Sequence, residues 1–319
     1  MKKYYLLSLI IIFVIGILAF DYFNNIKEKN IISPLPEELN SSNNSQVSSL
    51  DFWLPSLFGF FSSGSNSDSS IPILTAKAAL VYDLKNNKAI YEKNTEERVP
   101  MASLTKIMTA IIAIDNKKPN NRYVVRNESL VGENTIGLSE GEIMGLEELL
   151  LGVFMYSAND AAEVLADNTL GREKFIETMN DKAKALGLKN TNFTNPTGLE
   201  GDGEQYSTAE DLLILSRHAI ENYPEIAKAA RTVERHLPET EDHFEYYLYS
   251  QLNLLTTYPG VKGLKDGYTP EAGWCLITYY EKDDQELMGI ILGSEDRRGE
   301  MKALLDYSLT ELGITPPQT

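Results

Sequence analysis

Cysteine and histidine are both scarce in this sequence of 319 residues. Cys275 is the only cysteine, so no disulfide can form within the chain, but many exported proteins also lack disulfides and the compartment stays open. The three histidines, His218, His236 and His243, do not stand in a metal-ligand spacing such as His-Glu-x-x-His. We therefore expect neither a metal site nor a cofactor.

Basic residues are few relative to acidic ones. The chain has 29 Lys and Arg against 46 Asp and Glu, which gives a formal net charge of −17. This acidity argues against nucleic-acid binding and favours a soluble, self-repelling body. The length fits one large domain or two small ones, and the sequence contains no internal repeat.

The amino terminus departs from this composition. Lys2 and Lys3 precede residues 4–20, an uncharged run of 17 residues rich in Leu, Ile and Phe. Positive residues before an apolar stretch mark an export signal whose amino end stays inside the cell. Because no clear small-x-small cleavage site precedes Asp21, we favour an uncleaved membrane anchor at 1–23 over a removed signal peptide. The rest of the chain would then lie outside the cytoplasm.

Residues 24–72 have the composition of a disordered linker. Serine and asparagine runs at 40–45 and 62–67 cannot bury enough apolar area to offset the entropy of the chain. An aromatic island at 51–61 interrupts them and fits a segment that enters the membrane interface, docks on the folded domain, or is only an apolar patch in a linker. We expect the folded domain at 73–319.

Strand patterns stand at both ends of this domain and helical patterns lie between them. The segments 78–91 and 274–292 each carry two apolar strands around a polar turn and predict β-hairpins. We expect further strands at 122–126, 232–237, 244–249 and 261–269, and helices at 100–115, 146–156, 161–170, 174–186, 206–220, 224–231 and 300–312. This order predicts an α/β fold of the α+β kind, in which a mainly antiparallel sheet packs against helices.

The helix predicted from residue 100 places a hydroxyl beside an amine. Pro100 suits a first turn, and the residues after Lys106 are apolar on nearly every face, as in a buried helix. Ser103 and Lys106 are three apart and therefore neighbours on one face. A lysine in apolar surroundings shifts towards its neutral form, which would make Lys106 a base beside a nucleophile. The same pattern also fits an ordinary helix start with a capping serine and a snorkelling lysine.

Two further polar motifs follow. Ser157 and Asn159 stand between two apolar helices, either as functional side chains or as helix punctuation in which Asn159 or Asp160 is an N-cap. Near the end of the chain, glycines surround Lys265, which suggests a strand that another backbone approaches closely.

Three motifs thus occur in order along the chain: Ser103-x-x-Lys106, Ser157-x-Asn159 and Lys265-Asp266-Gly267. They resemble the signature motifs of penicillin-binding proteins and serine β-lactamases, and their surroundings resemble one branch more closely, the serine D-alanyl-D-alanine carboxypeptidases. The segments that carry the resemblance are Ala-Ser-Leu-Thr-Lys-Ile-Met-Thr-Ala at 102–110, Ser-Ala-Asn-Asp-Ala-Ala at 157–162, Asn-Pro-Thr-Gly-Leu at 195–199, Tyr-Ser-Thr-Ala at 206–209 and Gly-x-Lys-x-Gly-Tyr-Thr-x-x-Ala-Gly at 263–273. The similarity covers residues 77–312. It implies a β-lactamase/transpeptidase-like fold, an antiparallel sheet flanked by helices with an all-helical subdomain inserted.

The resemblance assigns catalytic roles. Ser103 would attack the carbonyl between two D-alanines, and Lys106 would take its proton. Ser157 would relay a proton to the leaving amine, while Asn159 would orient Lys106 and bind the substrate backbone. The backbone N–H groups of Ser103 and Tyr268 would form an oxyanion hole, and water would then hydrolyse the acyl-enzyme.

The resemblance also implies a substrate-binding set: Lys265, Asp266, Gly267, Tyr268, Thr269 and Arg297. Lys265 would in addition help to hold the amine of Lys106 neutral. Arg297 is identified by alignment on Leu304-Leu305 and would support the pocket for the terminal carboxylate of the substrate.

Asp266 departs from the family, which has threonine here and uses its hydroxyl to bind that carboxylate. Two facing carboxylates repel each other, by about 1 kcal/mol in water and by several when water is excluded. The change would be tolerated if Asp266 turned away, paired with Lys262 or an arginine, or were neutral. Otherwise substrate preference would change or activity would be lost.

Three functions follow from these alternatives. The first is a membrane-tethered D,D-carboxypeptidase that trims peptidoglycan stem peptides outside the cell, with β-lactams as covalent inhibitors. The second is a serine β-lactamase, although no Glu-x-x-Asn segment lies between Asn159 and Lys265. The third is a catalytically impaired penicillin- or peptidoglycan-binding protein in which Asp266 has ended catalysis. Because the sequence stops soon after the last predicted helix, we expect attachment through the amino terminus only.

Overall fold

The computed structural model describes residues 71–318. The predicted anchor at 1–23 and the aromatic island at 51–61 lie outside the described residues, as does the predicted linker apart from its last two positions. Within the described part, no helix is both long and apolar enough to cross a bilayer.

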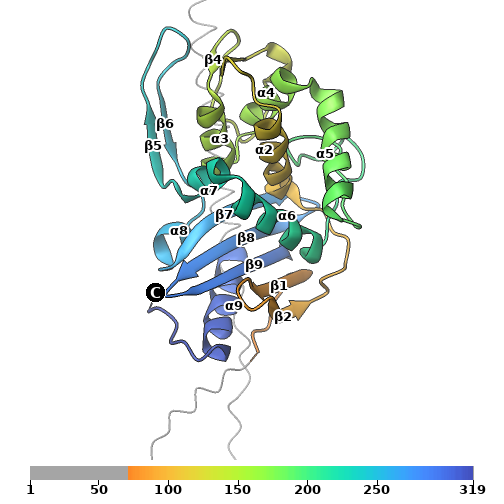
Figure 1. The fold of residues 1–319 in the computed structure, drawn as a ribbon, viewed down its shortest axis with the longest axis vertical. Coiled ribbons are helices and arrows are strands. Elements are labelled where there is room, and N and C mark those ends of the chain that lie inside the picture. Colours follow the sequence, from red (N-terminus) through yellow and green to blue (C-terminus); the bar gives the residue numbers. More distant parts are fainter. Residues whose placement is uncertain (1–70, 319) are drawn as a thin grey trace, which may run out of the picture. The chain divides into compact units, whose positions relative to one another are not determined.

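A five-stranded antiparallel sheet runs through the described part of the chain in the order β2-β1-β9-β8-β7 (Figure 1). Its strands are β1 (Ala78–Asp83), β2 (Lys88–Lys93), β7 (Val261–Thr269), β8 (Gly273–Lys282) and β9 (Gln285–Ser294). Both predicted hairpins are confirmed, and they join where β1 pairs with β9. Asp283 and Asp284 have φ values of 46° and 69°, as a type I′ turn between β8 and β9 requires.

Helices cover both faces of this sheet. Helix α9 (Arg297–Glu311) packs on one face, and α6 (Ala209–Asn222) and α7 (Pro224–Arg231) lie on the other (Figure 1). Because side chains alternate along a strand, Leu80 of β1 joins the core on the α6 side and Val81 joins the core under α9. The sheet therefore separates two apolar cores.

Helix α2 (Lys106–Asp115) lies at the centre of an all-helical layer. It contacts α3 (Leu146–Met155), α4 (Asn159–Thr169) and α5 (Arg172–Leu186). Every residue of α2 is buried except its last, which confirms the prediction of a buried helix that is apolar on nearly every face. The predicted helical insertion thus lies between β2 and β7 in the chain, in a stretch that also holds two small two-stranded sheets.

Smaller elements complete the described chain. Two-stranded sheets form from β3 (Tyr123–Val124) with β4 (Ile143–Met144) and from β5 (Glu234–Leu237) with β6 (Tyr246–Tyr249). The short helical segments are η1 (Ala102–Thr105), η2 (Asn127–Ser129) and α8 (Leu254–Thr257).

Capping side chains set the starts of two helices, and for the helix expected from 206 the sequence predicts a cap at Ser207 or Thr208, of which Thr208 is confirmed. Helix α6 begins after Thr208, whose hydroxyl accepts a hydrogen bond from the N–H of Asp211. Helix α9 begins earlier than predicted because Asp296 accepts from the N–H of Gly299 and caps it.

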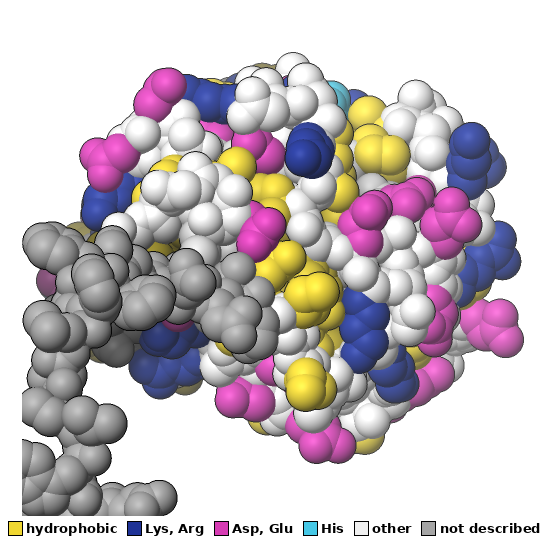
Figure 2. Space-filling view, turned by 90° about the horizontal axis from the view of Figure 1, so that it is seen from below, with side chains coloured by type: hydrophobic (Ala, Val, Ile, Leu, Met, Phe, Trp, Pro, Cys, Tyr) yellow, Lys and Arg dark blue, Asp and Glu magenta, His cyan; other side chains and the backbone are white. Residues whose placement is uncertain are grey.

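Charges of both signs share the surface around α9. Figure 2 shows the molecule from below, with Lys and Arg side chains interspersed among Asp and Glu. The negative net charge of the chain is therefore not gathered into one patch on this face.

The packing of α9 can be tested at Leu304, which is 0% exposed. Leu304→Ala should lower the free energy of unfolding by about 2–5 kcal/mol, because it leaves a cavity between helix and sheet. Leu312→Ala, at a half-buried position just after the helix, is the control and should have a clearly smaller effect. Urea denaturation measures both, and equal losses would show that α9 does not pack as described.

Candidate active site

The side-chain amine of Lys106 lies where three segments of the chain meet. Its Nζ is 3.0 Å from Ser103 Oγ, 2.7 Å from Asn159 Oδ1 and 2.6 Å from the backbone oxygen of Thr197. Lys106 itself is 0% exposed. Ser103 and Lys106 are neighbours as predicted, although Ser103 lies in the 3-10 turn η1 and the helix predicted from residue 100 begins only at Lys106. The implied contact of Asn159 with Lys106 is present, and Thr197 is a partner that the sequence did not indicate.

The surroundings of Lys106 favour its neutral form. Burial lowers the pKa of Lys106 well below its usual value, and the positive charge of Lys265 lowers it further. A neutral amine has two N–H donors and one lone pair. Because the oxygens of Asn159 and Thr197 can only accept, they take both donors, and the lone pair is left to face the hydroxyl of Ser103.

Two glycines let other backbones approach the turn that carries Ser103. A Cβ at Gly198 would lie 2.1 Å from the backbone oxygen of Ala102, and a Cβ at Gly267 would lie 2.8 Å from the backbone nitrogen of Ser103. Ala102 has a φ of 48°. The expectation that a backbone approaches the glycines around Lys265 is therefore confirmed, and that backbone is the one that carries Ser103.

Ser157 and Asn159 enter the site from the junction of α3 and α4. Ser157 has a φ of 58°, and its buried Oγ has no hydrogen-bond partner among the described residues. Asn159 donates through Nδ2 to the backbone oxygen of Glu133 at 2.9 Å and accepts from Lys106 through Oδ1. This arrangement aims one free hydroxyl and one fixed amide into the same space.

The junction does separate α3 from α4, but the prediction that Asn159 or Asp160 is the N-cap is wrong. Ala158 is the N-cap of α4, and no side chain caps the helix. Asp160 instead accepts from the N–H groups of Gly137 and Leu138, both at 3.1 Å, and so holds a neighbouring loop.

Asp266 is held between two cations. Its Oδ2 lies 2.6 Å from Arg297 Nη2, and its Oδ1 lies 3.2 Å from Lys265 Nζ. Burial alone would raise the pKa of Asp266, but Lys265 and Arg297 hold it below its usual value, so the carboxyl group is ionised. Pairing with an arginine is thus confirmed, and the second partner is Lys265 rather than Lys262.

A cavity of about 430 Å3 lies over these groups. Eight of the ten residues singled out from the sequence line it: Ser103, Ser157, Asn159, Asp266, Gly267, Tyr268, Thr269 and Arg297. The other two, Lys106 and Lys265, lie beneath it and are 0% and 1% exposed. The structure therefore brings all ten together.

Sequence reasoning missed some of the lining and the third partner of Lys106. The unpredicted lining residues are Glu133, Asn134, Leu199, Gln251 and Trp274. The backbone oxygen of Thr197 is presented by a turn in which Asn195 Oδ1 accepts from the N–H groups of Thr197 and Gly198. An Asn-Pro-Thr-Gly run signals such a turn, but no local pattern says which side chain its carbonyl will meet.

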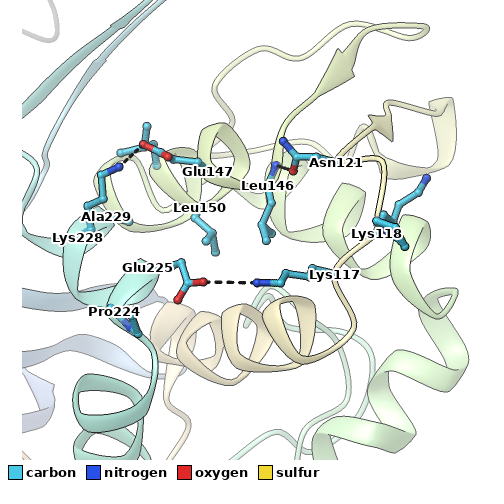
Figure 3. Close-up of a pocket in the computed structure, with 12 residues that line it drawn as sticks. Lys117, Lys118, Asn121, Leu146, Glu147, Leu150, Pro224, Glu225, Lys228 and Ala229 are labelled. Atoms are coloured by element: carbon cyan, nitrogen blue, oxygen red, sulfur yellow. Dashed lines mark hydrogen bonds and ion pairs between the residues drawn. The ribbon is translucent and has the colours of Figure 1, made fainter.

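A larger cavity, of about 650 Å3, lies elsewhere, between the end of α2, the start of α3 and α7 (Figure 3). Charged groups around it pair with each other, Lys117 with Glu225 at 3.8 Å and Lys228 with Glu147 at 2.7 Å. None of the ten sequence-predicted residues lines it. The larger cavity has no arrangement of side chains that suggests a reaction. The smaller cavity is therefore the candidate active site.

The side chains of the smaller cavity suit acyl transfer. Its lining offers hydroxyls, amides and an ion-paired carboxylate, and two buried amines lie beneath it, one of which contacts the hydroxyl of Ser103 as a base contacts a nucleophile. Within residues 71–318, no cluster of three or more His, Cys, Asp or Glu side chains is arranged to hold a metal ion.

The site combines a serine with a buried lysine beside the edge strand of an antiparallel sheet. This combination defines the class of penicillin-binding and related serine acyl-transfer proteins. Solved structures of such proteins share the fold of this chain. The D-alanyl-D-alanine carboxypeptidase from Mycobacterium tuberculosis H37Rv is 28% identical with a TM-score of 0.70, over 77% of this chain and 95% of that one. Penicillin-binding protein D2 from Listeria monocytogenes, in its cefotaxime-bound form, is 30% identical with a TM-score of 0.65, over 75% of this chain and 99% of that one. The predicted β-lactamase/transpeptidase-like fold is confirmed.

Residues 65–296 match the D-alanyl-D-alanine carboxypeptidase family, peptidase S11, and the chain belongs to this family. The D-alanyl-D-alanine carboxypeptidase DacF of Bacillus subtilis is 36% identical over 251 residues, which are 76% of this chain and 64% of that protein. DacC of Escherichia coli is 31% identical over 71% of this chain and 58% of its own length. The chain thus spans less than two thirds of these curated relatives.

The close approach at Gly198 gives a test of the site. Gly198→Ala should lower the free energy of unfolding by about 2–4 kcal/mol and slow the reaction of Ser103 with an acylating reagent, because the new Cβ collides with Ala102. Gly201→Ala is the matched control, since Gly201 also has a positive φ, +105°, but nothing lies within 4 Å of its Cβ position. Denaturation and acylation rates should separate the two variants. Equal effects would mean that backbone strain, not the clash, explains the loss.

Proposed function

We propose that this protein is a serine-type D-alanyl-D-alanine carboxypeptidase that removes the terminal D-alanine from peptidoglycan stem peptides through an acyl-enzyme on Ser103. The observation that carries the proposal is the environment of Lys106, a buried amine whose two donors are taken by Asn159 and Thr197 and whose third contact is the hydroxyl of Ser103. The family of the chain supplies the substrate class.

Acylation begins when Ser103 Oγ attacks the carbonyl carbon between the two D-alanines. The hydroxyl proton passes to the lone pair of Lys106, which the lowered pKa of this amine keeps available. The backbone N–H groups of Ser103 and Tyr268 stabilise the oxyanion, and Gly267 supports this role because it lets β7 approach Ser103. One such donor is typically worth about 3 kcal/mol of barrier.

Ser157 then relays a proton to the leaving amine: it gives its own proton to the nitrogen and regains one from Lys106, which had taken it from Ser103. Its Oγ lines the cavity, is buried and has no partner among residues 71–318, so it is free to bond with a substrate nitrogen. As the carbon–nitrogen bond breaks, D-alanine leaves and the acyl group stays on Ser103. Water hydrolyses this ester and restores the enzyme.

The substrate backbone lies along the edge strand β7 and against Asn159. The proposed binding set is Lys265, Asp266, Gly267, Tyr268, Thr269 and Arg297, of which all but Lys265 line the cavity. An edge strand has free backbone groups, which suits the binding of an extended peptide.

We further propose that the catalytic domain lies outside the cytoplasm and is held at the cell membrane by residues 1–23. The support is the pair of lysines before the uncharged run at 4–20. An extracytoplasmic enzyme would meet both peptidoglycan and β-lactams, and the latter would acylate Ser103 as covalent inhibitors. Penicillin-binding protein D2 of Listeria monocytogenes, which shares the fold, is known in a cefotaxime-bound form.

Labelling with a fluorescent penicillin tests the nucleophile. The wild-type protein should acquire a long-lived label, and Ser103→Ala should acquire none. The release of D-alanine from a pentapeptide ending in D-Ala-D-Ala should disappear in the same variant. Rapid turnover of penicillin would identify a β-lactamase instead, and a folded wild-type protein without any label would identify a binding protein without catalysis.

The role of Lys106 can be tested through its proton. Arginine stays protonated at every accessible pH, so Lys106→Arg should slow acylation by at least about 100-fold. In the wild type, acylation should slow as the pH falls through the lowered pKa of Lys106, because protonation removes the lone pair, whereas alkaline pH leaves the amine neutral. The control is Lys262→Arg, the same substitution on β7 outside the cavity, which should keep the wild-type rate. An active Lys106→Arg variant would refute the proposed base.

A further inference from the structure

The cations that would meet the carboxylate of a leaving D-alanine are already bonded within the protein. Arg297 donates to Asp266 Oδ2 at 2.6 Å and to the backbone oxygen of Gly267 at 2.9 Å, and its guanidinium carbon lies 4.5 Å from the ring centre of Trp274. Lys265 Nζ donates to the backbone oxygen and to Oδ1 of Asp266, at 2.7 and 3.2 Å. A substrate carboxylate would have to displace these bonds.

Lys265, Asp266 and Arg297 form a cluster of three charged side chains. Its net positive charge is lower than it would be with threonine at position 266. With Lys265 and Arg297 protonated and Asp266 ionised, the three side chains sum to one positive charge, whereas threonine would leave two. The carboxylate of Asp266 lines the cavity and is only 8% exposed, so repulsion of a second carboxylate is weakly screened there.

The wall of the cavity near Ser157 leads to the β5–β6 hairpin, which stands beside α3 in Figure 1. Ser157, the proposed proton donor to the leaving amine, follows the end of α3 at Met155, whose backbone oxygen accepts from the N–H of Gln251 at 2.9 Å. Gln251 lines the cavity and stands two residues after Tyr249, the last residue of β6. The wall of the cavity thus continues into this strand.

Three exposed rings, Tyr247, Tyr249 and His236, form an aromatic row on this hairpin. Tyr247 and Tyr249 are 58% and 60% exposed, and His236 stacks on Tyr247 with ring centres 4.4 Å apart. Glu245 accepts from His236 Nε2 at 2.7 Å and from the hydroxyl of Tyr247 at 3.0 Å, which fixes the stacked pair. Rigid exposed rings provide contact area at little cost in conformational entropy.

The row is separated from the cavity lining by a short length of chain. An extended chain advances at most about 3.6 Å per residue, so the four residues from Gln251 to Tyr247 span up to about 14 Å. A leaving group of peptide length is long enough to cover this span, whereas one alanine, at about 3.6 Å, is not if the span is fully extended.

We propose that Asp266 weakens the preference for a free carboxylate beside the scissile bond, so that leaving groups without one are accepted at least as well as a terminal D-alanine, and that the aromatic row binds the rest of the leaving group when it is a second peptide. This inference rests on the proposed acylation of Ser103. Two leaving groups share the required chemistry: an amidated D-alanine, and the side-chain amine of a second stem peptide. In both, the bond from Ser103 Oγ to the carbonyl carbon forms, the carbon–nitrogen bond breaks, and the serine proton ends on the leaving nitrogen.

A matched pair of substrates tests the selection: an acyl-L-Lys-D-Ala-D-Ala peptide with a free carboxylate, and the same peptide as its carboxamide. The wild type should cleave the carboxamide with at least the kcat/KM of the acid. Asp266→Asn keeps the size and removes the charge, and Asp266→Thr restores the family residue. Both should shift the ratio of kcat/KM values towards the acid by about tenfold or more.

The ratio is measured within each variant, so partial loss of folded enzyme cancels. An unchanged ratio in both variants, or a wild type that strongly prefers the acid, would overturn the inference and leave the proposed function intact. Failure of the wild type to cleave either peptide would overturn both.

A cross-linked substrate tests the row. In this probe the D-alanine carbonyl is joined to the Nε of lysine in a second stem peptide. Tyr247→Ala combined with Tyr249→Ala should raise KM for this probe by about tenfold and leave cleavage of the short carboxamide unchanged. Phe244→Ala, at a position that is also 58% exposed but outside the row, is the control. No effect on the cross-linked probe, or an equal effect on both substrates, would refute the proposed role of the aromatic row in binding the leaving group.

Discussion

A lysine amine held away from water is the feature on which the rest of this structure depends. Burial lowers the pKa of Lys106, and that burial requires the apolar layer around α2. Once its hydration is lost, the amine needs other partners, which Asn159 and Thr197 provide from two distant segments. These partners also fix the orientation of the amine, so the same contacts that compensate for burial direct its lone pair to Ser103.

The second constraint is the close approach of three backbones. The turn at Ser103 is flanked by the loop at Gly198 and by β7 at Gly267, at distances that leave no room for a Cβ. Glycine at these positions thus allows the edge strand and the nucleophile to share one cavity. A peptide bound along β7 would lie next to Ser103 for the same reason.

Asp266 affects both the pair of cations Lys265 and Arg297 and the buried amine of Lys106. Its negative charge offsets Lys265 and Arg297, and it also raises the pKa of Lys106, against the larger effects of burial and of Lys265. If the proposed roles hold, an aspartate in place of threonine acts on leaving-group recognition and on the pKa of Lys106 together. The pocket keeps its shape because both cations have a partner, while the charge that it presents to a substrate is reduced.

The sequence by itself determined the features that depend on residues close together in the chain. Apolar alternation and turn residues predicted both hairpins, and the all-apolar run after Lys106 predicted a buried helix, because these signals act between neighbours in the chain. Ordered motifs predicted the family and the ten site residues. Only the tertiary structure decided that Asn159 bonds to Lys106 rather than capping α4, that Thr197 supplies a carbonyl, and that Asp266 pairs with Lys265 and Arg297. Each of these contacts joins a side chain to whatever group the fold brings within about 3 Å, and no local pattern encodes that distance.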